Sequence, residues 1–65
     1  MSELINEYRG LDFQQLKNKL QERVNTVLDI LENDEGEDLL MGLEQEITHI
    51  NVIFKKMDEE YFKNE

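Results

Sequence analysis

The chain contains no cysteine and no proline, and both absences limit what it can be. Without cysteine it has no disulfide and no thiolate metal site, and the composition fits a reducing compartment. Without proline there is no residue that breaks a helix from inside, and the abundant Leu, Glu, Gln and Lys favour helix throughout. With 65 residues, the chain makes one domain at most.

Side chains that carry catalytic chemistry are also scarce. There is one histidine, and the only hydroxyls besides tyrosine are Ser2, Thr26 and Thr48. No glycine-rich phosphate-binding pattern occurs. Carboxylates are numerous, but a small helical surface offers them no deep pocket that would shift a pKa. We therefore expect a protein that is not an enzyme and that uses no cofactor.

One pattern typical of metal sites is present, in Glu46 and His49. Their Glu-x-x-His spacing is the one used by di-iron carboxylate helix bundles. Both residues flank the apolar stripe described below instead of occupying it. The acidic turn around Gly36 also departs from a calcium-binding loop, because Leu31 stands where the first aspartate belongs and Gly42 where the glutamate belongs. We therefore expect no metal site, and a partly exposed His49.

Basic residues and long apolar runs are few. Seven Lys and Arg stand against sixteen Asp and Glu, which gives a net charge of −9 and disfavours nucleic-acid binding. No apolar run reaches the roughly 20 residues that span a bilayer. The first ten residues lack the basic and apolar segments of a secretory signal. These features predict a cytoplasmic protein with no membrane partner.

What the chain does have is a heptad pattern in its second half. Apolar residues recur there at alternating spacings of three and four, which is typical of a long helix that packs against other helices. This seam consists of Leu40, Leu43, Ile47, Ile50, Phe54, Met57 and Tyr61. A second stripe in the first half contains Phe13, Leu16, Leu20, Val24, Val27 and Leu31. Two such stripes predict two long helices.

We predict an all-α antiparallel hairpin in a single domain of residues 1–65. A short helix is expected at about residues 2–9, and long helices at about 13–32 and 35–62. Asp12 and Gln15 have the spacing of a capping box at the start of the first long helix.

The turn between the long helices is expected at residues 33–36. Asn33 or Gly36 can take the left-handed conformation that ends a helix. Asp34 and Glu37 repeat the capping pattern before the second long helix. Gly42, inside that helix, costs about 1 kcal/mol relative to alanine and is expected either to mark the close approach of a neighbour or to have no role.

So small a chain is marginally stable alone, and one hairpin leaves the flanks of its helices uncovered. We expect two copies to pair through the seam into a four-helix bundle; the alternative is a monomer closed by the short helix. In size and layout this architecture resembles Rop, the plasmid-encoded RNA-binding hairpin dimer. The resemblance is one of fold, without a shared motif, and it keeps RNA binding among the alternatives.

The charges divide the hairpin into two ends. No basic residue lies between Arg23 and Lys55, so the loop end is an acidic tip, whereas the five aromatic residues lie towards the open end, the base. The candidate partner-binding residues at the tip are Asp34, Glu35, Glu37 and Asp38. We expect a regulator or inhibitor whose tip imitates nucleic-acid charge on the basic surface of another protein, a strategy common among phages and mobile elements. The alternatives are a merely solvated loop and a structural subunit of a helical assembly.

Overall fold

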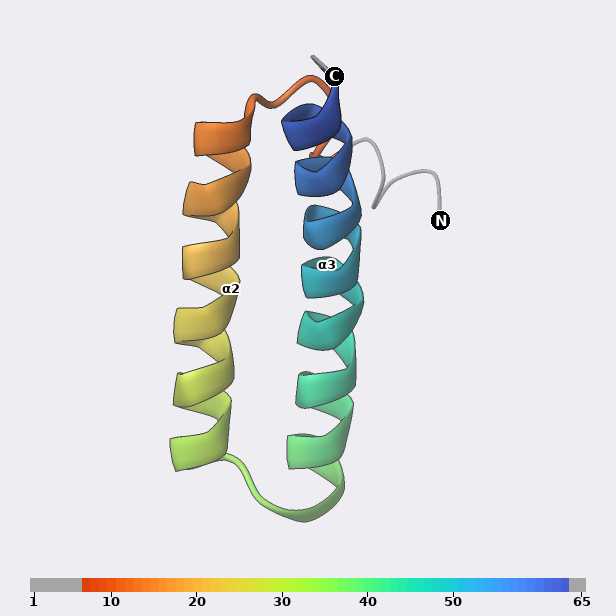
Figure 1. The fold of residues 1–65 in the computed structure, drawn as a ribbon. Coiled ribbons are helices and arrows are strands. Elements are labelled where there is room, and N and C mark those ends of the chain that lie inside the picture. The colour runs from red at the N-terminus through yellow and green to blue at the C-terminus, as the bar shows by residue number, and fades with distance from the viewer. Residues whose placement is uncertain (1–6, 64–65) are drawn as a thin grey trace.

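The computed structural model describes residues 7–63, which form two long antiparallel helices (Figure 1). Helix α2 runs Phe13–Asn33 and helix α3 runs Gly36–Phe62. The molecule is elongated, 44 × 21 × 15 Å, and the described residues contain no strand. The predicted all-α hairpin is confirmed. Most of the short helix predicted at about residues 2–9 lies outside the described residues.

The start of α2 carries the predicted capping box. The Asp12 carboxylate accepts a hydrogen bond from the Gln15 amide at 2.8 Å, and the Gln15 side chain accepts one from the Asp12 amide at 3.0 Å. Two amide donors that the helix itself leaves unpaired are satisfied in this way. Leu11, just before the cap, packs against the buried cluster that contains Leu16.

The turn between the helices corrects one prediction. Asp34 does not cap α3; its amide donates to the Ile30 carbonyl at 2.9 Å, so Asp34 is the closing residue of α2. The residue before α3 is Glu35, whose side chain makes no capping hydrogen bond. Gly36 takes the left-handed conformation, with φ at 61°, and Asn33 remains in α2. The connection is so short that Asp34 is needed to end one helix and cannot begin the next.

Near the loop, a glycine of α3 faces a branched side chain of α2. A Cβ atom on Gly42 would lie 3.3 Å from Cδ1 of Ile30, which is tight for carbon atoms. Gly42 thus marks the close approach of a neighbour. The missing side chain allows Ile30 of α2 to rest on the α3 backbone near the loop.

Residues 7–12 cover one side of the hairpin and complete its core. The chain reverses at Gly10, where φ is 80°, and Tyr8 is carried onto both helices. Tyr8, Leu16 and Ile53 are almost fully buried, and four half-buried residues pack around them: Leu11, Leu20, Val52 and Met57. Neither α2 nor α3 is apolar enough over a sufficient length to cross a membrane.

Candidate functional site

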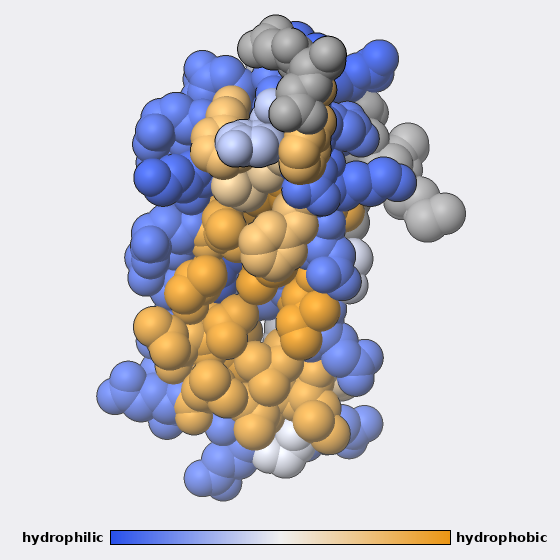
Figure 2. All heavy atoms as spheres, viewed as in Figure 1, coloured by the Kyte–Doolittle hydropathy of each residue, from blue (hydrophilic) through white to orange (hydrophobic). Residues whose placement is uncertain are grey.

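One long side of the hairpin leaves large apolar side chains exposed. Figure 2 shows apolar side chains gathered over both helices along most of the molecule. They lie on the side turned away from residues 7–12, which pass behind α3 in Figure 1. We define this open face by Phe13, Val24, Leu28 and Leu31 of α2 and by Leu40, Ile47, Phe54 and Tyr61 of α3. Between 38% and 66% of each of these residues is exposed.

The predicted heptad seam is divided between two surfaces. Leu43, Ile50 and Met57 are half-buried, whereas Leu40, Ile47, Phe54 and Tyr61 are at least half exposed. Residues seven apart return to nearly the same side of a helix after two turns, so each set forms its own row. One row of the seam therefore packs within the hairpin, and the other belongs to the open face.

The stripe of α2 divides in the same way. Leu16 is fully buried, Leu20 and Val27 are half-buried, and the remaining three residues are exposed. A rotation of about 50° separates the buried row from the exposed row on each helix. Because the helices are antiparallel, the two exposed rows turn to the same side of the hairpin. This geometry makes one continuous open face instead of two separate stripes.

Ile53 lies in an environment that the sequence did not indicate. It stands beside the heptad seam, on a flank that we expected a second hairpin to cover. In the structure Tyr8 covers it, and Ile53 is fully buried. The N-terminal segment thus closes one side of the hairpin, and the open face lies on another.

The two ends of the open face differ in shape. At the base, the rings of Phe13 and Tyr61 have centroids 6.1 Å apart, and Tyr61 meets Phe62 edge-on at 4.9 Å. Towards the loop the exposed side chains are aliphatic, namely Leu28, Leu31 and Leu40. Bulky rings therefore occupy one end of the face and leucines the other.

The four predicted partner-binding residues lie together at the loop end. Asp34 is half-buried, and Glu35, Glu37 and Asp38 are exposed. Glu37 and Asp38 lie in the first turn of α3, where the helix dipole favours negative charge. Within residues 7–63, none of the four forms an ion pair. No ion pair within the described residues therefore neutralises their charge.

Sequence reasoning missed a polar cluster that we call the Tyr8 cluster, formed by Glu7, Tyr8, Arg23, Glu46 and His49. The Tyr8 hydroxyl accepts a hydrogen bond from Nε of Arg23 at 3.2 Å and lies 2.8 Å from Nδ1 of His49. Arg23 also donates to both oxygens of Glu46, at 3.2 and 3.3 Å. The Glu7 carboxylate lies beside both partners, with Oε1 at 3.6 Å from Nη2 of Arg23 and Oε2 at 3.2 Å from Nδ1 of His49.

Burial and hydrogen bonding shift the pKa values of two groups in this cluster, Tyr8 and Arg23. Burial raises the pKa of the Tyr8 phenol, because a buried phenolate is poorly solvated, although the nearby Arg23 guanidinium opposes the shift. Burial lowers the pKa of Arg23, but its hydrogen bonds to Glu46 and Tyr8 outweigh that effect and leave the pKa raised. The phenol is thus held neutral and the guanidinium charged.

The same contacts give Glu46 and His49 separate roles. The Glu46 carboxylate binds the Arg23 guanidinium, while the His49 ring meets Tyr8 edge-on with centroids 5.8 Å apart. Every buried side-chain nitrogen or oxygen in the described part of the chain has a hydrogen-bond partner. The cluster therefore ties the N-terminal segment to both helices, and no local sequence signal joined its members.

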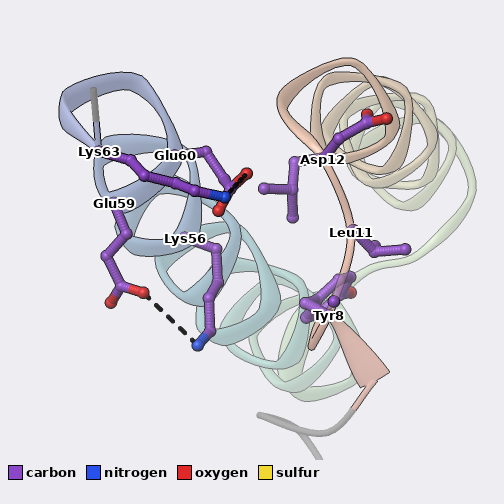
Figure 3. Close-up of a pocket in the computed structure, with 9 residues that line it drawn as sticks. Tyr8, Leu11, Asp12, Lys56, Glu59, Glu60 and Lys63 are labelled. Carbon is purple, nitrogen blue, oxygen red and sulfur yellow. Dashed lines mark ion pairs between the residues drawn. The ribbon is translucent and has the colours of Figure 1, made fainter.

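A cavity of about 300 Å³ lies at the base, between residues 8–12 and the end of α3 (Figure 3). Its charged α3 lining is paired internally: Lys56 lies 3.7 Å from Glu59, and Lys63 lies 3.6 Å from Glu60. These pairs leave little charge to attract a ligand. We therefore place the candidate site on the open face and the tip.

No family model, curated protein or solved structure matches this chain.

Proposed function

We propose that this protein acts by binding other proteins, and that its open face pairs with a second copy to form a four-helix bundle. The observation that carries the proposal is the open face, where one row of large apolar residues from each helix is exposed on the same side of the hairpin. Contiguous exposed apolar surface on a small protein marks an interaction site. Full burial of one large apolar side chain stabilises by about 1.5–3 kcal/mol, so covering the face would add substantially to a marginal fold.

The spacing of the face favours a helical partner. Leu40, Ile47, Phe54 and Tyr61 stand seven residues apart, which is the repeat of helices that pack side by side. A second hairpin presents two such rows, one from each of its helices. The pairing of two open faces would give a bundle of four helices with a common core.

Substitution of an exposed residue tests the pairing without damage to the hairpin core. Ile47→Glu places a charge in the middle of the open face, where Ile47 is 51% exposed in the single chain. We expect wild-type protein to sediment as a dimer and the variant to sediment as a helical monomer. Met41→Glu is the matched control, because Met41 is also exposed but lies off the face. A wild-type monomer at high concentration would contradict the proposal.

A second candidate role is recognition of a basic protein surface by the acidic tip. It is favoured by the four tip carboxylates that form no ion pair within residues 7–63. On this proposal the dimer is a regulator or inhibitor that occupies a partner's cationic site in place of nucleic acid. Charge complementarity of this kind mainly increases the rate of association and its salt dependence.

Amide substitution at the tip tests this role. A partner is first captured from a native host lysate on the immobilised wild-type protein, at low and at high salt. The triple variant Asp34→Asn, Glu35→Gln, Asp38→Asn should keep its helical content and bind this partner more slowly, with a weaker salt dependence. A variant with the same charge change at Glu22, Asp58 and Glu59 is the control. If the triple variant binds with the kinetics of the wild type, the tip has no role in binding and is only a solvated loop. Recovery of no partner favours a structural subunit, and nuclease-sensitive recovery favours RNA binding.

A further inference from the structure

We infer that the second copy docks on the open face in the opposite direction, so that the tip of each hairpin lies on the base of the other. The inference rests on the proposed pairing of two copies and adds its orientation. Two independent features of the described residues carry it: the distribution of charge along the hairpin, and the distribution of side-chain size along the open face.

The charge of the hairpin is strongly polarised along its length. Residues 24–48, the tip half, carry eight Asp and Glu and no Lys or Arg, which gives −8. The described base residues, 7–23 and 49–63, carry seven Lys and Arg and six Asp and Glu, which gives +1. Two tips packed together would place −16 at one end of the bundle, whereas opposed copies place −8 beside +1 at each end. Screening over about 8 Å at physiological salt weakens this preference without reversing it.

The residues that flank the open face show the same polarity. Glu32 and Glu44 lie one turn beyond Leu28 and Leu40 respectively, at the tip. Lys17 lies one turn beyond Phe13, at the base, and Asp58 is the acidic residue at the same level of α3. Within residues 7–63, Lys17, Glu32 and Glu44 form no ion pair. Opposed copies bring the flanking lysine of each hairpin towards the flanking glutamates of the other.

Side-chain size leads to the same orientation. The face is aromatic at the base, with Phe13 and Tyr61 in contact, and aliphatic at the tip, with Leu28, Leu31 and Leu40. Well-packed cores set large residues against smaller ones across the contact. Copies packed in the same direction would crowd four to six rings into one end, while opposed copies place each aromatic base on leucines.

The orientation makes a geometric prediction about position 40. Leu40 and Tyr61 are 21 residues apart on α3, about 30 Å along the helix axis at 1.5 Å per residue. In opposed copies, Leu40 of one copy lies near the base of the other, so the two Leu40 positions are about 30 Å apart. In copies packed in the same direction by a two-fold axis, α3 of one copy lies against α2 of the other, so Leu40 lies near Leu31 of the second copy at the tip. A disulfide requires Cα atoms within about 7 Å, so it distinguishes the two arrangements.

The test uses single-cysteine variants of a chain that has no native cysteine. Leu40→Cys and Leu31→Cys mark the tip, and Tyr61→Cys and Phe13→Cys mark the base; all four residues are exposed in the single hairpin. Gln45→Cys, exposed on α3 but off the open face, is the control for random collision. The variants are mixed in pairs, refolded together and oxidised gently, and the disulfide products are identified by mass spectrometry.

We expect a mixed tip–base disulfide with at least one of the two base variants, in excess of random pairing, and little disulfide between Leu40→Cys and Leu31→Cys. A dominant disulfide between these two tip variants, with dimers seen by light scattering, would overturn the orientation and leave the dimer intact. A second result would overturn both the dimer and this inference. In that result the wild-type protein is a monomer by light scattering, and every variant forms no more disulfide than the Gln45→Cys control.

Discussion

The Tyr8 hydroxyl lies 2.8 Å from Nδ1 of His49, a residue 41 positions further along the chain. Nε of Arg23 donates to the same hydroxyl, so the phenol contacts a guanidinium of α2 and an imidazole of α3 at once. One side chain thereby joins the N-terminal segment to α2 and α3 together. The contact closes one side of a hairpin whose open face remains uncovered.

Tyr8→Phe removes both hydrogen bonds of the hydroxyl and keeps the buried ring. We expect the free energy of unfolding to fall by about 1–2 kcal/mol, the usual range when a buried donor and acceptor lose a shared partner. Urea unfolding followed by circular dichroism measures the loss. Tyr61→Phe is the control, since Tyr61 is 66% exposed and its substitution should change stability little. Equal losses in the two variants would show that the cluster adds nothing.

Stability should also depend on the ionisation of Tyr8 at high pH. Burial raises the folded-state pKa of this phenol above its ordinary value of 10.0, so the neutral form is favoured in the folded state. The contribution of the neutral Tyr8 phenol to the free energy of unfolding is then complete below pH 10.0. It is lost as the pH rises through the raised folded-state pKa. We expect Tyr8→Phe to lose less stability than wild type over this alkaline window. Parallel pH curves for the two proteins would contradict the assignment.

The ion pair of Arg23 and Glu46 should show strong coupling. Only 11% of the Glu46 side chain is exposed, so Arg23→Met leaves a buried carboxylate without its hydrogen-bond partner. We expect this variant to lower the free energy of unfolding by about 1.5–3 kcal/mol. The double variant Arg23→Met, Glu46→Met should cost clearly less than the sum of the two single variants. A double-mutant cycle by urea unfolding measures the difference. Additive losses would mean that the pair contributes no interaction of its own.

The substitution Gly42→Ala should have two opposing effects on stability, a gain in helix propensity and a steric contact with Ile30. Gly42→Ala gains about 1 kcal/mol of helix propensity but places a methyl group 3.3 Å from Ile30 Cδ1. We expect little net change in wild type and a clear gain in an Ile30→Val background, where Cδ1 is absent. Thermal unfolding of the four proteins measures the coupling. An equal gain in both backgrounds would show that the contact is not tight.

Short-range patterns were enough to predict the hairpin and the start of α2. The Asp12 and Gln15 cap depends on residues three apart, and the heptad repeat depends on residues on one helix. The acidic pattern at Asp34 and Glu37 was misleading, because it has the same local form as a cap. Whether Asp34 ends α2 or begins α3 depends on how few residues connect the helices, which the pattern does not contain.

The Tyr8 cluster could not be predicted because its members are far apart in the sequence. Tyr8 lies 15 residues from Arg23 and 41 from His49, and only the folded hairpin brings them together. The heptad seam was predicted as one stripe, and its division into a packed row and an exposed row could not be predicted for the same reason. The choice depends on the side of the hairpin that the N-terminal segment covers, and Tyr8 covers Ile53.

The same separation gives Tyr8 a late place in the order of folding. We expect the two helices to meet first beside their short loop, where Ile30 and Gly42 are close in sequence and the chain entropy lost on contact is small. Tyr8 is then expected to find its partners only after both helices have formed, with its native contacts largely absent from the transition state. The contacts of the phenol should therefore slow unfolding. Their loss should increase the unfolding rate and shorten the lifetime of the native state, while the rate of refolding hardly changes.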